Sequence, residues 1–231
     1  MKHTIALFAL LLSTVQALAA RAPDEGVPSR VEVKYRVSVA GLPVGQGVDV
    51  FQHDGKTYSI VSESTVALVL TVRREAKGSV TAGGLRPLSY VETRNGRFKR
   101  SANFDWAAGQ VQLTEGDQTQ TVPLPPNTWD AASLAWNFAF SRSDGKDLQV
   151  HMTDGRRVTH YTYTILGREK ITTPLGELET MHVKKVQENG DKRAFEVWLA
   201  IDRHLLPARV LATEKDGTAF DSMVESVNLA P

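Results

Sequence analysis

The sequence predicts a mainly β protein. We expect a single domain in which a curved antiparallel sheet, a half-barrel or an open barrel, carries one helix on its concave face. Short segments of alternating apolar and polar residues follow one another along most of the chain, and a period of two is typical of half-buried strands. Turn signals such as Asn95-Gly96 separate these segments. Only residues 128–140 have the spacing of a helix.

The composition is that of an ordinary globular protein. Hydrophobic residues make up 42% and charged residues 23% of the 231 residues, which excludes a disordered tail, a collagen-like fibre and a multi-span membrane protein. A formal net charge of +1 gives no strong attraction to nucleic acid, so nucleic acid is not expected as a partner. The chain has no cysteine, which excludes disulfides, thiolate metal sites and cysteine nucleophiles.

The N-terminus has the pattern of a secretory signal peptide. A basic start, Met1-Lys2-His3, precedes a largely apolar run over 4–15, and Ala17-Leu18-Ala19 supplies the small residues of a cleavage site. The apolar run is too short to span a bilayer, which needs about 20 residues. We therefore expect a signal peptide over 1–19 cleaved after Ala19, a flexible lead-in over 20–30 and one β domain over 31–231. The mature chain is expected in a bacterial periplasm, without a transmembrane segment.

The strands follow in order from the alternation and the turns. Residues 31–39 alternate valine or tyrosine with polar residues, so one face of this strand is expected to be buried. Turns at 41–45, Asp54-Gly55 and Asn95-Gly96 return the chain, and 83–87 is expected to break it. Strands are expected over 31–39, 46–52, 58–64, 73–81, 88–93, 97–106, 110–114, 119–124, 148–152, 157–166, 170–173, 178–186, 194–200, 205–213 and 219–229.

One helix is expected over residues 128–140. The segment is rich in alanine and has no glycine or proline, and Thr128 or Asp130 can cap its first turn with a side-chain oxygen. Four of its residues fall on one stripe at helical spacing. They are Trp129, Ser133, Trp136 and Phe140.

A series of short motifs runs along the chain. The early ones are Tyr35-Arg36-Val37, Gly41-Leu42-Pro43-Val44-Gly45, Tyr58-Ser59-Ile60, Gly84-Leu85-Arg86-Pro87 and Phe104-Asp105-Trp106. The later ones are Asp130 with Ser133-Leu134, Thr173-Pro174-Leu175-Gly176-Glu177-Leu178, Glu196-Val197-Trp198-Leu199-Ala200, Leu206-Pro207-Ala208-Arg209-Val210 and Glu214-Lys215-Asp216-Gly217-Thr218. In this order, over residues 31–229, they resemble the domain-of-unknown-function 3108 family of exported bacterial proteins. One departure is Ile201-Asp202, where the family often has Pro-Asp.

The resemblance implies an exported, single-domain, mostly antiparallel β protein, with no established activity and no catalytic set. The expected curvature of the sheet rests on a looser analogy with the half-barrels of periplasmic lipoprotein carriers. Such an analogy concerns the fold and carries little weight for function.

The sequence shows no catalytic constellation. The mature chain has five scattered histidines, and although His160 and His182 could meet across strands, two histidines without a third ligand seldom form a closed metal site. Glu177 and Glu179 alternate along one strand, as a glycosidase pair could, but a solvated strand face is the commoner arrangement. We therefore predict a protein that is not an enzyme, with no catalytic residue, no metal and no cofactor.

The candidate ligand-binding residues are Trp106, Trp129, Trp136, Phe140, Arg73 and Arg74. Two interpretations stay open for the aromatic residues: they fill the core, or they wall an apolar cavity under a helix that acts as a lid. In Phe104-Asp105-Trp106 the aspartate could simply cap the following turn. Arg73 and Arg74 could meet an anionic headgroup or could blunt a sheet edge.

Three functional hypotheses follow. The first is an envelope protein that binds an apolar or lipid-like ligand, with a lipid or a lipidated envelope protein as partner. The second is an interaction or assembly factor of the envelope, which would have an exposed apolar patch or sheet edge. The third is a hydrolase of cell-wall or polysaccharide material, which would need converging carboxylates or histidines. The sequence does not fix the oligomeric state.

Overall fold

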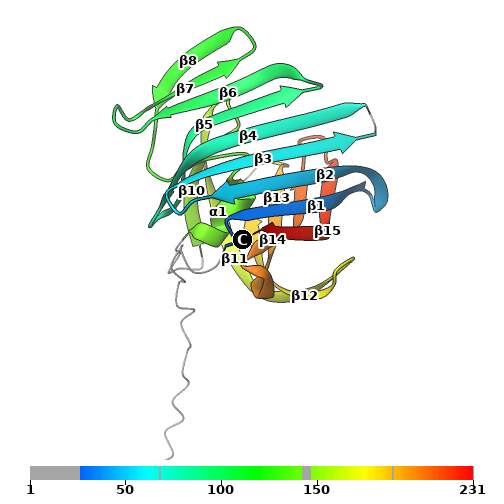
Figure 1. Cartoon of the computed structure of the whole chain (residues 1–231). Helices are drawn as coiled ribbons and strands as arrows, with labels where there is room; N and C mark the ends of the chain where they lie inside the picture. The colour runs from blue at the N-terminus through cyan, green and yellow to red at the C-terminus, as the bar shows by residue number, and fades with distance from the viewer. Residues whose placement is uncertain (1–26, 68, 142–146, 189, 231) are drawn as a thin grey trace, which may run out of the picture.

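The fifteen strands found among the described residues belong to one open sheet. The computed structural model describes residues 27–67, 69–141, 147–188 and 190–230. The predicted signal peptide and most of the lead-in lie outside these residues. The strand order is β8-β7-β6-β5-β4-β3-β2-β1-β15-β14-β13-β12-β11-β10-β9. The first and last strands therefore lie side by side in the middle of the sheet (Figure 1).

The first half of the chain forms eight strands. They are β1 (Arg30–Val39), β2 (Leu42–His53), β3 (Thr57–Val66), β4 (Leu70–Thr81), β5 (Gly84–Arg94), β6 (Arg97–Asp105), β7 (Gln110–Glu115) and β8 (Gln118–Pro123). Each pairs antiparallel with the next, and both Asn95 and Gly96 have positive φ, as a type I′ hairpin turn requires. The mainly β, largely antiparallel fold predicted from the sequence is confirmed.

The second half adds seven strands and the helices. They are β9 (Thr128–Asp130), α1 (Leu134–Phe140), β10 (Asp147–Thr153), β11 (Val158–Thr173), β12 (Gly176–Lys185), β13 (Ala194–Ala200), the short 3-10 helix η1 (Ile201–Arg203), β14 (Leu206–Thr213) and β15 (Ala219–Ala230). Of the described strand pairs, only β9 with β10 is parallel. Among these residues, no helix has the length and hydropathy of a membrane span.

The predicted helix over residues 128–140 is about twice as long as the observed one. Thr128–Asp130 instead forms β9, which pairs with β10, and a turn follows before α1 begins at Leu134. The Asp130 carboxylate causes this turn, because its Oδ1 accepts hydrogen bonds from the backbone N–H groups of Ala132 and Ser133 at 2.8 and 2.9 Å. Neither of the two predicted capping residues caps the helix, because Thr128 lies in β9 and Asp130 caps the turn that precedes α1.

The predicted chain break at residues 83–87 is also wrong. β5 begins at Gly84 and runs through Pro87, which pairs opposite Gly78 at a register shift in β4. A bulge is where a sheet tolerates proline, because the missing N–H is not needed there.

Apolar side chains form two clusters, and α1 contributes to both. Trp136 stacks on Phe51 of β2 with ring centroids 4.9 Å apart, and Phe140 packs against the same ring. Phe138, on another side of α1, packs edge-on against Trp129 and against Tyr163 of β11. The predicted stripe therefore divides, with Trp136 and Phe140 in one cluster and Trp129 in the other.

The two ends of the strand order contact each other. Gln120 of β8 donates a hydrogen bond to the backbone carbonyl of Arg156, in the turn between β10 and β11, at 3.0 Å. Gly155 of the same turn lies against Arg100 and Ser101 of β6, where an added Cβ would come within 3.2 Å of both residues. The sheet is open in its strand pairing, but side chains and turns connect its ends.

Candidate functional site

Two features of the structure could bind a ligand, and the first is a cavity of about 400 Å³ near the start of β5. We call it the tryptophan cavity, because Trp106 and Trp129 both line it. Leu85 and Leu124 add aliphatic surface, and Arg86 lies on its border. The volume is within the range of small-molecule sites, which are typically concave and mostly apolar.

Trp106 is held in place by its neighbours. Its indole N–H donates to the backbone carbonyl of Pro87 at 2.7 Å, its ring lies parallel to Phe104, and the guanidinium of Arg86 lies 4.4 Å from its ring centroid. Asp105, between the two aromatic residues, accepts a hydrogen bond from the backbone N–H of Ala108 and so caps the turn, as the sequence suggested. The half-buried indole is thus ordered, with a cation over its ring face.

The helix α1 is fastened to β5 beside this cavity. Asn137 accepts a hydrogen bond from the backbone N–H of Leu85 at 2.8 Å and donates one to the Leu85 carbonyl at 2.9 Å. Gly84 makes this approach possible, because a Cβ there would come within 2.6 Å of Asn137 Oδ1. Its φ of +118° is also one that glycine adopts at little cost.

The second feature is an arginine cluster built around a buried carboxylate, Glu92 of β5. Glu92 is 1% exposed, and Arg74, Arg94 and Arg100 donate hydrogen bonds to it at 3.1, 3.0 and 2.8 Å. The register explains the convergence, because Arg74 of β4 and Arg100 of β6 are the cross-strand partners of Glu92. Tyr90 donates a further hydrogen bond at 3.2 Å.

The charge of Glu92 is stabilised by these arginines. Burial alone would raise the pKa of its carboxyl, but the guanidinium groups of Arg74 and Arg100 outweigh burial and lower the pKa to about 2. Glu92 is therefore ionised at neutral pH. One carboxylate cannot neutralise three guanidinium groups, so the positive charge is in excess here.

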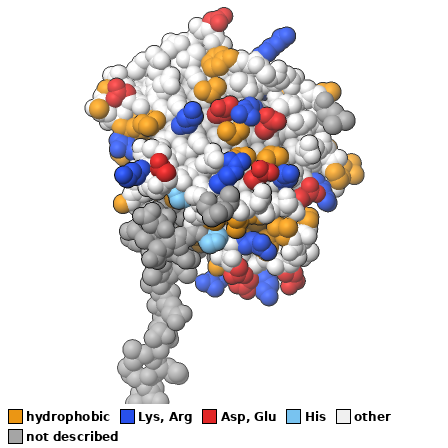
Figure 2. Space-filling model, viewed as in Figure 1, with side chains coloured by type: hydrophobic (Ala, Val, Ile, Leu, Met, Phe, Trp, Pro, Cys, Tyr) orange, Lys and Arg blue, Asp and Glu red, His pale blue; other side chains and the backbone are white. Residues whose placement is uncertain are grey.

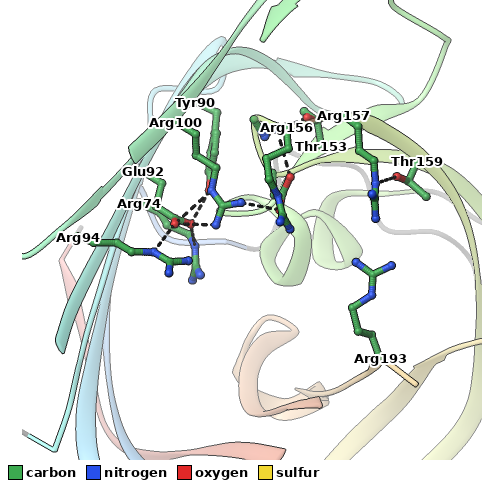
Figure 3. A network of polar contacts seen from close by, with 12 residues as sticks. Arg74, Tyr90, Glu92, Arg94, Arg100, Thr153, Arg156, Arg157, Thr159 and Arg193 are labelled. Carbon is green, nitrogen blue, oxygen red and sulfur yellow. Dashed lines mark hydrogen bonds and ion pairs between the residues drawn. The ribbon is translucent and has the colours of Figure 1, made fainter. Parts of the chain in front are cut away.

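Two further elements bring more arginines to the cluster. Arg100 also pairs with Asp154, in the turn after β10, at 2.9 Å, and Arg156 donates to the same carboxylate at 2.7 Å. Arg193, in the segment before β13, pairs with Asp191 at 3.0 Å. Figure 3 shows Arg74, Arg94 and Arg100 gathered around Glu92, with Arg156 beside them and Arg157 and Arg193 farther away.

Elsewhere the charges are mixed. In Figure 2 the lysine and arginine side chains on the face toward the viewer alternate with aspartates and glutamates, as a net charge of +1 suggests. On β4, for example, Arg73 pairs with Glu63 at 3.4 Å and with Glu75 at 2.8 Å. The arginine cluster therefore differs in charge balance from the surface in Figure 2, because its positive charges outnumber its negative ones.

The six predicted ligand-binding residues separate into three groups. Trp106 and Trp129 line one cavity although 22 positions separate them. Trp136 and Phe140 are buried in the core, at 0% and 3% exposure, and Trp136 donates to Asp49 at 3.2 Å. Arg74 belongs to the arginine cluster, whereas its neighbour Arg73 points to the other face of β4, as alternation along a strand requires.

The residues considered for catalysis lie apart. His160 faces His151 across the β10–β11 pair, with ring centroids 5.1 Å apart, and does not meet His182. His182 instead lies between Glu169 and Glu196 and stacks on Trp198. Among the residues that the structure describes, no three histidine or acidic side chains group as a metal site. Glu177 and Glu179 are exposed on β12.

The fold has a structural relative in a crystal structure described as a β-barrel-like protein of the domain of unknown function DUF1849 from Brucella abortus. That protein has a TM-score of 0.54 and 8% identity, with coverage of 89% of this chain and 100% of that chain. A "putative lipoprotein" from Parabacteroides distasonis gives a TM-score of 0.34 and 13% identity, with coverage of 90% and 98%. At 8% identity the first similarity concerns the fold alone, and a TM-score of 0.34 is too low for the second to indicate a common fold. No curated protein matches the sequence.

A family model does match. The family described as "Protein of unknown function (DUF3108)" aligns with residues 34–224, which contain both the tryptophan cavity and the arginine cluster. This range also holds nearly all of the motifs on which the resemblance was based, so that prediction is confirmed. The chain belongs to the DUF3108 family.

Proposed function

We propose that this protein binds an apolar or lipid-like ligand in the cell envelope, with the tryptophan cavity as the binding site. One observation carries the proposal: Trp106 and Trp129 come together in a cavity of about 400 Å³ with Arg86 at its border. Sites of this size bury most of a small ligand, and an indole offers apolar area with little entropy to lose.

The proposal includes the curvature of the sheet, the bounds of the domain and the cellular location. The sheet is a half-barrel with α1 on its concave face, and the contacts between Gln120 and Arg156 and between Phe51 and Trp136 support this arrangement. The chain forms one β domain over 31–231 behind a signal peptide cleaved after Ala19. The mature protein acts in the periplasm, and the N-terminal sequence pattern supports this location.

Native mass spectrometry tests the proposal. The mature protein is purified from a bacterial periplasm without detergent, and its mass is compared with that after lipid extraction and after titration with a long-chain fatty acid. We expect one bound molecule per chain. A chain that stays free of ligand before and after titration would contradict the proposal and would favour the assembly-factor hypothesis.

Brominated fatty acid, which quenches nearby tryptophans, locates the site. We expect quenching of the wild-type fluorescence that is reduced in Trp106→Phe and largely lost when Trp129→Phe is added, because both tryptophans line the cavity. Trp198→Phe is the matched control, since Trp198 stacks on His182 and does not line the cavity. Equal loss of quenching in Trp106→Phe and Trp198→Phe would place the fatty acid elsewhere.

A further inference from the structure

We propose that the arginine cluster is a second binding site, which takes a ligand bearing a phosphate or a similar oxyanion. It is separate from the tryptophan cavity and does not depend on it. Residues 84–86, at the beginning of β5, line the cavity, whereas Glu92 and Arg94 of the cluster lie at the other end of the same strand.

The cluster carries more positive charge than its own carboxylates balance. The arginines drawn in Figure 3 are Arg74, Arg94, Arg100, Arg156, Arg157 and Arg193, and the carboxylates that pair with members of this group are Glu92, Asp154 and Asp191. Asp49, Glu115, Asp130 and Lys185 act on members of this group or on their partners from neighbouring elements, and with them seven cations face six carboxylates. The arginines come from β4, β5, β6, the β10–β11 turn and the segment before β13, so their gathering is a product of the whole fold.

The arginines of one wall have donors left for a ligand. Arg74 and Arg94 each donate to Glu92 through Nε. Arg74 also interacts with the Tyr90 hydroxyl, and the side chains of Arg74 and Arg94 are 35% and 43% exposed, so part of each guanidinium group stays accessible. Because both are bonded to one carboxylate, their free ends lie next to each other in Figure 3.

The opposite wall is arranged in a similar way. Asp154 holds the Nε and one Nη of Arg156, whose side chain stays 46% exposed. Arg193 donates hydrogen bonds to both carboxylate oxygens of Asp191 at 3.0 and 3.4 Å, and its side chain stays 25% exposed. Glu92 lies beneath the arginines at 1% exposure, so an incoming anion meets the guanidinium groups first.

This chemistry selects oxyanions. Planar guanidinium groups match phosphate and carboxylate geometry and form short, charge-assisted pairs with them. A group with several oxygens can bridge the two walls, which a single chloride ion cannot do. The oxyanion could belong to a soluble phosphate compound or to a lipid headgroup. Exposed apolar residues on the neighbouring hairpin tips, Val69 and Phe98, give the lipid source a physical basis.

Calorimetric titration of the full mature chain with inorganic pyrophosphate, and flotation with vesicles of phosphatidylglycerol or phosphatidylcholine, test the site at constant ionic strength. The variants are Arg94→Gln and Arg193→Gln, which lie on opposite walls. Both side chains are partly exposed, and Arg193 does not contact Glu92, so its loss leaves that buried group paired. Arg73→Gln is the matched control, because it removes the same charge from the other face of β4.

We expect one of the anionic probes to bind and each cluster variant to raise its Kd about tenfold, the worth of a charged hydrogen bond. Arg73→Gln should leave the Kd within about a factor of two. Binding of pyrophosphate identifies a soluble ligand, and binding of phosphatidylglycerol vesicles alone identifies a headgroup. Failure of both probes would overturn the proposal. An equal loss in Arg73→Gln, or equal binding to phosphatidylcholine, would overturn it as well.

Discussion

The side chain of Asn137 pairs with the backbone of Leu85, as a neighbouring strand normally would. Leu85 lies beyond the part of β5 that pairs with β6, which begins at Ser89, so its backbone N–H and carbonyl have no strand partner on that side. The Asn137 amide supplies both an acceptor and a donor there. The primary amide of asparagine carries the acceptor and the donor on separate atoms, so it can pair with both backbone groups of one residue at once.

We expect Asn137→Ala to lower the free energy of unfolding by about 2–4 kcal/mol, because it leaves two buried backbone groups without partners. Urea denaturation followed by circular dichroism measures the change. Asn103→Ala, at an exposed position of β6, is the control and should cost less than about 0.5 kcal/mol. Similar losses in the two variants would show that the Asn137 hydrogen bonds contribute little.

Asp130 makes stability depend on pH. Burial raises the pKa of its carboxyl to about 6, against the hydrogen bonds from Ser133 and Ala132. The folded state therefore holds the proton more tightly than the unfolded chain, whose carboxyl has a pKa near 3.8. This contribution to stability is complete below pH 3.8 and is lost as the pH rises through 6, a change of about 3 kcal/mol.

The Asp130→Asn variant should lack this contribution. We expect the difference in unfolding free energy between wild type and variant to shift in favour of the variant between pH 4 and pH 7. Urea denaturation at several pH values measures it, and Asp105→Asn controls for the loss of an exposed carboxylate that caps a turn. A difference that stays constant with pH would contradict the raised pKa.

At the scale of elements, most strands and the presence of one helix are predictable from the sequence, whereas β9, the continuity of β11 and the start of the helix are not. Alternation over residues 31–39 and the turn at Asn95-Gly96 locate β1 and the β5–β6 hairpin correctly, because these signals are local. The start of the helix depends on a distant contact, since Thr128–Asp130 is drawn into a strand by β10. Alanine-rich composition cannot reveal such a partner.

The helix α1 should matter for stability mainly through Trp136. Its side chain is completely buried and stacks on Phe51, so Trp136→Ala should cost about 3–5 kcal/mol. Trp106 is half-buried, and Trp106→Ala should cost clearly less. Chemical denaturation followed by circular dichroism compares the two variants. Equal costs would mean that Trp106 belongs to the core as much as Trp136 does.

At the scale of the molecule, Gly155 is where the two ends of the strand order meet. Its φ is +89°, and an added Cβ would come within 3.2 Å of Arg100 and Ser101. Gly217 has a φ of +90° but open space around it, so it is a matched control for the backbone cost alone. We expect Gly155→Ala to be less stable than Gly217→Ala by about 1–2 kcal/mol. Thermal unfolding measures this difference, and its absence would show that the contact is loose.

The same scale explains which site residues the sequence could reveal. Trp106 and Trp129 stand out in the sequence as large aromatic residues, and the pair Arg73-Arg74 stands out as a possible site for an anionic headgroup. Arg100, Arg156 and Arg193 carried no such signal, because each looks like an ordinary charged strand or turn residue. Only the register of β4, β5 and β6, together with the turn that reaches β6, shows that these charges share one place.

The central pairing of β1 with β15 has a consequence for how the chain comes to be folded. β1 pairs with β15, the strand farthest from it along the sequence, with Arg30 opposite Ala230 and Val39 opposite Phe220. Each half can form from neighbouring hairpins, but the seam between the halves closes only when both β1 and β15 are available. Until then the edge of β1 is unpaired and can pair with a strand of another molecule. We therefore expect a truncation that removes β15 to yield aggregates rather than a smaller folded protein.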